Sequence, residues 1–473
     1  MKSLQDIKIN YAYSHILGYN EDGTISHVNS NLAMYDIHPY YGPPCMDADE
    51  YFKKRNIEIP VKNVDDAEHH VIHQLNGFNG QNMLNFTDNS RDNFIQHNVD
   101  DLYDSDIKFI YPLIIYDNSI FEKYETIDFD IRLVECVKKK QAKILFSYLT
   151  EGYFSEDDHE LIWLNNLSKR YGFDKEDLII LTSNLIADEN KNELIENKII
   201  EDNYTIIGWP YFGNDLWFGE DGSGRLLSDE IKKIHRINFD KFNKLNKTKK
   251  KDIHFMCFNR VPRSHRILLF GEIKTNPQLN DKCIITLGFH DDSEKMDFYR
   301  EARRHLDHSY KHGAQRIFSF LHGYDSTKPT FYDEPDMENN KACTLNMELH
   351  SSSFLNIVTE TLTNPKSLFF SEKIYKPIYM LQPFILMGNP NSLKMLKKLG
   401  FKTFDKWWDE SYDDEVDMVK RLEKIVDVLL EISTWDMDKC FQVTQEMEEV
   451  LKHNSNRLLE NVDYERLYNQ LLF

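Results

Sequence analysis

A short segment of the chain gathers several cations around one predicted turn. In MCFNRVPRSHRILLF (256–270), an apolar run of strand length leads into a turn with a proline, and a helical pattern follows. Its candidate ligand-binding side chains are Asn259, Arg260, Arg263, His265 and Arg266. Cations at a helix N-terminus are unfavourable unless an anion offsets them, whereas free N–H groups and arginine forks suit a phosphate. The segment predicts an anion site; pairing of one or two arginines with nearby carboxylates is the alternative.

A second set of polar residues follows later in the chain, in NIVTETLTNPKSLFFSEKIYKP (356–377). Its candidate binding residues are Glu360, Ser371, Glu372, Lys373 and Lys376. Ser371 is a good N-cap, and an acid in the next position suits the helix dipole. A carboxylate there can also accept two sugar hydroxyls, and the lysines could reach a phosphate. The alternative is that Glu372 is only a first-turn acid. Pro377 predicts a short or bent helix.

Both segments belong to a chain of alternating strand and helix patterns. In the first half, strand-like runs occur at 107–116, 142–149, 177–184 and 203–211, with a helical pattern at 157–173. In the second half, strands are expected at 253–259, 283–289, 316–321, 354–360 and 382–388, and helices around 263–275, 294–311, 371–381, 391–399 and 415–432. Such alternation predicts an α/β fold with two Rossmann-like, doubly wound domains facing a cleft.

The domain boundary is placed at a change in composition. Residues 232–266 carry twelve Lys or Arg residues and two acids, within an otherwise acidic chain. Their middle, FNKLNKTKKKD (242–252), is typical of a solvated crossing between domains, although a functional basic patch is an equal alternative. The predicted domains are 1–240 and 250–473, and residues 1–105 are expected to form an irregular N-terminal elaboration with short elements.

Composition limits the partners. The formal net charge of −21 disfavours broad contact with nucleic acid, which depends on Lys and Arg. The six cysteines are scattered without any C-x-x-C pair, which argues against a zinc or redox site and favours the reducing cytoplasm. Neither a signal peptide nor an apolar stretch long enough to span a membrane is recognisable.

The second polar set resembles the donor-binding signature of the fucosyltransferases. The shared features are an acid after a strand (Glu360), a Ser/Thr-Glu-Lys helix start (371–373) and an apolar strand ending near glycine (383–388). The resemblance covers 354–404 well and the arginines of 256–266 less closely; Ser371 stands where the family has Thr. The segment 401–413 is also similar in style to phage or large-virus glycosyltransferases.

The resemblance implies a GT-B glycosyltransferase that is inverting and metal-independent. Its co-substrate would be a UDP- or GDP-linked sugar, with no other cofactor, and its acceptor a hydroxyl, most simply on a glycan. Arginine and lysine would stabilise the departing diphosphate in place of a metal. No D-x-D triplet follows an obvious strand, which agrees with this implication. A viral origin would place the enzyme in the host cytoplasm.

An acceptor hydroxyl needs a base, for which Glu151 is the candidate because it follows the strand at 142–149. A plain loop acid is an equal alternative, and His15 and His38 are weaker choices. The aromatic segment 208–218 could stack on an acceptor sugar or pack a core, and Trp407-Trp408 could close over a donor or cap a core. Two other functions remain open: glycosylation of a modified DNA base, and a non-catalytic, carbohydrate-binding virion protein.

Overall fold

A computed structural model gives the fold of the chain. It describes residues 9–13, 15–19, 25–30, 94–115, 121, 127, 129–148, 152, 154–156, 158–210, 229–288, 314–323 and 345–459. The chain divides into two compact units, which are described separately. Unit 1 comprises residues 1–211 and 462–473, and unit 2 comprises residues 212–461. Among the described residues, no helix is long and apolar enough to cross a membrane.

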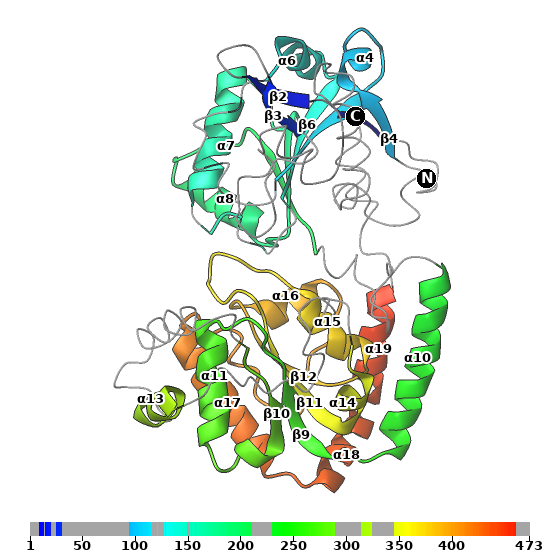
Figure 1. The fold of residues 1–473 in the computed structure, drawn as a ribbon, viewed down its shortest axis with the longest axis vertical. Coiled ribbons are helices and arrows are strands. Elements are labelled where there is room, and N and C mark those ends of the chain that lie inside the picture. The colour runs from blue at the N-terminus through cyan, green and yellow to red at the C-terminus, as the bar shows by residue number, and fades with distance from the viewer. Residues whose placement is uncertain are drawn as a thin grey trace. The chain divides into compact units, whose positions relative to one another are not determined.

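Unit 1 is built on a six-stranded sheet with strand order β4-β1-β5-β6-β7-β8, in which every neighbouring pair is parallel (Figure 1). The strands are β1 (Ile9–Tyr13), β4 (Phe94–Asn98), β5 (Phe109–Ile114), β6 (Ala142–Tyr148), β7 (Leu178–Thr182) and β8 (Thr205–Gly208). A separate hairpin joins β2 (His15–Tyr19) to β3 (Ile25–Ser30). The helices are α4 (Val99–Tyr103), α6 (Ile131–Lys138), α7 (Asp158–Tyr171) and α8 (Ala187–Glu196).

Continuous burial explains why the central strands of unit 1 are parallel. All five residues of β7 are buried, and so are six of the seven residues of β6. A strand that is apolar on both faces needs cover on both sides, which helical crossovers provide in a parallel sheet. The strands expected at 107–116, 142–149, 177–184 and 203–211 are therefore confirmed, as is the helix expected at 157–173.

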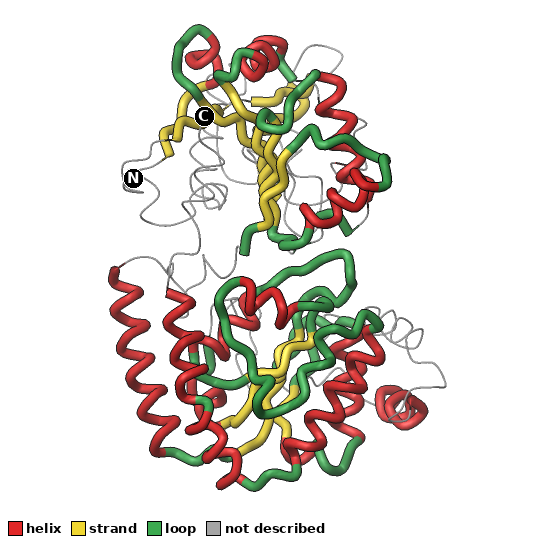
Figure 2. Tube along the Cα trace, turned by 180° about the vertical axis from the view of Figure 1, so that it is seen from behind, coloured by secondary structure: helices red, strands yellow, loops and turns green. Residues whose placement is uncertain are grey.

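Unit 2 contains a four-stranded parallel sheet with strand order β10-β9-β11-β12. Its strands are β9 (Ile253–Cys257), β10 (Cys283–Ile285), β11 (Ser353–Thr359) and β12 (Phe384–Met387). Its helices are α10 (Asp229–Thr248), α11 (Ser264–Thr275), the 3-10 turn η3 (Asn280–Lys282), α13 (Ala314–Gly323), α14 (Met347–Ser352), α15 (Glu372–Tyr379), α16 (Ser392–Lys398), α17 (Met418–Ser433), α18 (Met437–Glu446) and α19 (Glu448–Leu459). Helices flank this sheet on both sides (Figure 2).

The order of strands in unit 2 creates a topological switch point. From β9 the chain moves to β10 on one side, and it then returns past β9 to β11 and β12 on the other. The connections leaving β9 and β11 consequently diverge, and ligands of such sheets bind beyond the carboxyl ends of the strands at this place. The two units are thus both α/β and Rossmann-like, as the alternating pattern predicted.

Three expectations about elements are wrong. Residues 316–321 form part of helix α13 instead of a strand, because Ile317 and Leu321 lie one turn apart and both pack toward α11. The basic segment expected to cross between domains is mostly helical, since α10 reaches Thr248 and belongs to unit 2. The N-terminal region is not only an elaboration, because β1 and β4 are members of the sheet of unit 1. The helix expected at 294–311 lies outside the described residues.

Candidate anion-binding site

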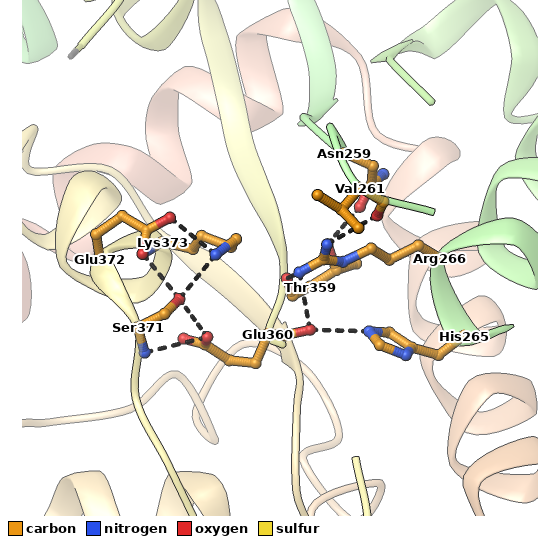
Figure 3. Close-up of polar contacts among 9 residues, drawn as sticks. All are labelled: Asn259, Val261, His265, Arg266, Thr359, Glu360, Ser371, Glu372 and Lys373. Atoms are coloured by element: carbon orange, nitrogen blue, oxygen red, sulfur yellow. Dashed lines mark hydrogen bonds and ion pairs between the residues drawn. The ribbon is translucent and has the colours of Figure 1, made fainter. Parts of the chain in front are cut away.

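The polar residues predicted at two distant segments meet at the carboxyl edge of the unit 2 sheet. Asn259 follows β9, and Glu360 follows β11 directly. Figure 3 shows Glu360 between the two groups, with Arg266 and His265 on one side and Ser371 and Lys373 on the other. The arginine segment and Glu360 thus lie close together in the structure.

Asn259 joins the ends of three strands and is almost fully buried. Its backbone N–H donates to Thr286 Oγ1 (2.8 Å), and its side-chain amide donates to the carbonyl oxygen of Thr286 (3.1 Å). Its Oδ1 accepts a hydrogen bond from Thr359, the last residue of β11. With its polar atoms engaged in this way, Asn259 shapes the edge of the sheet.

His265 and Arg266 hold the loop after β11 instead of facing solvent. His265 Nε2 donates to the carbonyl oxygen of Glu360 (2.9 Å). Arg266 Nη2 donates to the carbonyl oxygens of Thr359 (3.0 Å) and Glu360 (3.1 Å), and Nη1 donates to that of Val261 (2.9 Å). Both side chains are only 3% exposed, so their role is to position the backbone of both segments (Figure 3).

Burial and neighbouring cations set the protonation of these two residues. Burial, followed by the charge of Arg266, holds the pKa of His265 well below its ordinary value, so the imidazole is neutral. Burial lowers the pKa of Arg266 to about 10, with Arg263 contributing in the same direction. The carboxyl groups of Glu360 and Glu372 raise the pKa of Arg266. The three side chains therefore lie close enough to interact electrostatically.

Arg260 and Arg263 differ from Arg266 because both are only half-buried. Arg263 occupies the N-cap position of α11 and makes no side-chain cap hydrogen bond, since a guanidinium has no acceptor. The backbone at Arg260 is tightly constrained, because a Cβ atom added to Gly288 would lie 2.3 Å from the Arg260 carbonyl oxygen. Two half-buried arginines thus lie next to a helix N-terminus at the sheet edge.

The start of α15 is linked to the buried Glu360 carboxyl. Ser371 is the N-cap of α15, and its Oγ accepts from the backbone N–H of Lys373 (3.3 Å). Ser371 donates through its Oγ and its backbone N–H (3.1 Å) to Glu360 Oε2. Burial raises the pKa of Glu360, although Lys373 and Ser371 counteract this. Glu360 therefore fixes the position at which α15 begins.

Glu372 and Lys373 form an ion pair that solvent can still reach. Lys373 Nζ donates to Glu372 Oε1 (2.8 Å) and to Ser371 Oγ (3.1 Å). The Glu372 side chain is 15% exposed and that of Lys373 28%, so both can contact a solute. Burial raises the pKa of Glu372, but Lys373 and Lys376 outweigh it and leave the pKa below its ordinary value. Glu372 is therefore an ionised acceptor at neutral pH, and Lys376 is half-buried nearby.

Arg421 is a component of the site that the sequence analysis missed. This arginine of α17 is 1% exposed and donates to the carbonyl oxygens of Gly388, Glu415 and Val416. It also reaches the carbonyl oxygen of Thr363 in the loop after β11 (3.4 Å). Arg421 thereby ties the loops after β11 and β12 together. The sequence signal, one arginine within an amphipathic helix, is not distinctive.

The other predicted residues have mixed outcomes. Glu151, the candidate base, lies outside the described residues, as do residues 211–218 of the aromatic segment. Trp209 is buried, and Trp408 is 4% exposed and packs against Phe404, so these two indoles belong to cores. In the described part of the chain, no cluster of three His, Cys, Asp or Glu side chains is arranged to hold a metal ion.

Comparisons with known proteins add little to this geometry. No protein-family model matches the sequence. A comparison with curated protein sequences found no match either. Among solved structures, the chain is similar to the N-terminal domain of trehalose-6-phosphate phosphatase from Candida albicans, with 10% identity and a TM-score of 0.34, over 93% of this chain and 84% of that one. A likeness at this level carries no conclusion about activity.

Proposed function

We propose that the protein is an inverting, metal-independent glycosyltransferase of the GT-B type, which uses a nucleoside-diphosphate sugar as donor. The observation that carries the proposal is the joining of two polar segments at the topological switch point of unit 2. Half-buried Arg260 and Arg263 lie at one helix start, and the Glu372–Lys373 pair lies at another. A phosphorylated, hydroxyl-rich molecule would suit both the cations and the ionised acceptor.

Each group has a part in donor binding. Arg260, Arg263 and the first N–H groups of α11 bind the diphosphate, because guanidinium forks and a helix N-terminus both favour phosphate oxygens. Lys373 and Lys376 contribute further positive charge. The Glu372 carboxylate accepts hydrogen bonds from hydroxyls of the donor. Asn259, His265, Arg266, Glu360 and Ser371 hold these groups in place through the hydrogen bonds described above.

The same groups assist the chemical step. When the bond between the sugar and the diphosphate breaks, negative charge grows on the departing oxygen. Fixed cations and N–H dipoles stabilise that charge without having to reorganise. A base removes the proton of the acceptor hydroxyl while the hydroxyl oxygen attacks the anomeric carbon, on the face opposite the departing diphosphate. We assign this role to Glu151 of unit 1, which follows β6, and we expect a glycan acceptor.

Nucleotide binding by the full-length protein tests the proposal. Calorimetry against UDP, GDP, ADP and CMP should reveal micromolar or tighter binding of at least one nucleoside diphosphate. Arg263→Ala should weaken that binding about 10- to 100-fold, because it removes charge-assisted hydrogen bonds. Glu372→Gln should weaken it as well, through the lost charge of the hydroxyl acceptor.

Arg236→Ala provides the matched control. Arg236 is an exposed arginine of α10 that belongs to neither polar segment, so its removal changes the net charge equally and should leave nucleotide affinity unchanged. Failure of all four nucleotides to bind would contradict the proposal. So would equal affinities of the Arg263→Ala, Glu372→Gln and wild-type proteins, because the binding site would then lie elsewhere.

A further inference from the structure

The compositional break of the sequence forms a long helix with two distinct faces. The inner face of α10 packs on unit 2: Phe242 is buried, Asn238 donates to Tyr379 Oη (2.8 Å), and Asn246 donates to the carbonyl oxygen of Leu381 (2.8 Å). These contacts fix how the helix is rotated about its axis. Figure 1 shows α10 at the outside of unit 2, with α19 next to it.

The outer face carries a row of cations around an apolar residue. Helical spacing puts Ile237, Lys241, Lys244 and Thr248 on one stripe, opposite Phe242. Lys241 and Lys244 are exposed, and Ile237 is 60% exposed. Because an α-helix rises about 1.5 Å per residue, the stripe is roughly 16 Å long.

The cations in the middle of this helix differ from those near its end. Toward the end of α10, Lys247 pairs with Glu448 (2.8 Å) and Lys250 pairs with Asp438. Within the described part of the chain, by contrast, no ion pair involves Arg236, Lys241 or Lys244. The exposed acid in their midst is Asp240. Three cations therefore face solvent in a protein whose formal net charge is −21, where solubility does not require them.

We propose that the outer face of α10 docks the protein on an anionic lipid surface. Lys241 and Lys244, exposed on the same side of the helix, complement a plane of negative headgroups. Their stems can lie along that plane while the ammonium groups meet phosphates. Ile237 inserts between headgroups, which is favourable because it removes an apolar side chain from water. The acidic remainder of the protein has little effect on this contact, because charges beyond about 8 Å are screened at physiological ionic strength.

A nucleic acid is the less favoured partner for this face. Duplex phosphates would attract the same lysines, but they offer no apolar surface to Ile237. This inference goes beyond the proposed function and does not depend on it, because α10 lies outside the two polar segments of the candidate site.

Co-sedimentation of the full-length protein with lipid vesicles tests the inference. We expect binding to vesicles of phosphatidylglycerol and phosphatidylcholine, no binding to phosphatidylcholine alone, and release by high salt. Lys241→Gln with Lys244→Gln should weaken binding about thirtyfold, since each basic residue near an anionic bilayer changes the partition coefficient about fivefold. Ile237→Ser should weaken it less and independently of salt.

The matched control is Lys402→Gln with Lys406→Gln, which removes two exposed lysines from another part of unit 2. This double variant should bind vesicles as the wild type does. Equal binding by the α10 and control variants, or no binding of the wild type to the anionic vesicles, would overturn the inference. Tighter, Lys241- and Lys244-dependent binding to a DNA duplex than to vesicles would also overturn it.

Discussion

At the scale of single residues, the candidate site contains half-buried side chains and buried side chains that hold the backbone around them. Arg266, for example, donates only to backbone carbonyl oxygens in its described contacts, whereas Arg263 is half-buried at a helix start. Because the buried guanidinium of Arg266 fixes two loops, we expect it to restrict the movement of Arg263 as well. We therefore expect substitutions of positioning residues to weaken ligand binding, even where these residues never touch the ligand.

Gly288 offers a test of this rigidity. A methyl group at Gly288 would lie 2.3 Å from the Arg260 carbonyl oxygen, so Gly288→Ala must displace backbone that carries a candidate ligand-binding arginine. We expect the free energy of unfolding to fall by about 1–3 kcal/mol, as for other overpacked sites. The affinity for the nucleoside diphosphate should fall in the same variant. Denaturant titration and calorimetry measure the two effects.

Gly323→Ala is the control for that prediction. A methyl group at Gly323, the last residue of α13, meets nothing within 4 Å. It should leave nucleotide affinity unchanged and stability unchanged or raised by up to about 1 kcal/mol. Similar losses in both variants would show that the close approach at Gly288 has no special importance.

The sequence pattern predicts that both polar segments follow strands, but it does not distinguish the roles of the residues within them. Arg263 and Arg266 look alike in the sequence, yet one lies at the N-cap of α11 and the other is buried a turn further on. Which face of a helix is covered depends on the strand packed against it. For the same reason Arg421, which comes from a distant helix, could not be connected to the loops after β11 and β12.

At the scale of elements, strands in the buried centre were easiest to predict. The expected strands near 354–360 and 382–388 became β11 and β12, because long apolar runs in an αβ alternation have few alternatives. Residues 316–321 were misassigned, since a short apolar run suits a strand or a buried helix equally well. The high charge of the basic segment predicts a solvated crossing, because it outweighs the inner-face pattern that includes Phe242.

Lys251 links α10, α14 and β9, and it leads to a prediction about pH. Its Nζ donates to Asn246 Oδ1 (3.0 Å) and to the Ser351 carbonyl oxygen (3.0 Å). Burial lowers the pKa of Lys251 from 10.5 to about 8. Between these two values the unfolded chain binds more protons than the folded one, so the free energy of unfolding should rise with pH, by about 3 kcal/mol at most.

Lys251→Met should remove this rise, which thermal unfolding between these pH values can measure. The control is Lys249→Met, two residues earlier, where the lysine is 44% exposed. That variant should keep most of the wild-type slope, because Lys249 contributes less than burial to the lowered pKa of Lys251. The same flattening in both variants, or no change in either, would contradict the assignment of the rise to the buried ammonium group.

At the scale of the whole molecule, a cation-rich sheet edge would allow a strongly acidic protein to bind the diphosphate that we propose as its ligand. A local field near the ligand matters more than the total charge. If arginines and lysines carry the charge of the leaving group, a divalent ion is dispensable. Donor hydrolysis or sugar transfer should then proceed at the same rate in excess EDTA as in its absence. Activity that disappears with EDTA and returns with Mg²⁺ or Mn²⁺ would contradict the metal-independent mechanism.

The central claim is that the carboxyl edge of the unit 2 sheet binds a nucleoside diphosphate. A crystal structure of the full-length protein with the nucleotide selected by calorimetry tests it most directly. The account predicts phosphate oxygens within hydrogen-bonding distance of Arg263 and of the Lys373 ammonium group, with the Glu372 carboxylate on hydroxyls of the ligand. A nucleotide bound to unit 1, or to unit 2 away from these three residues, would contradict it.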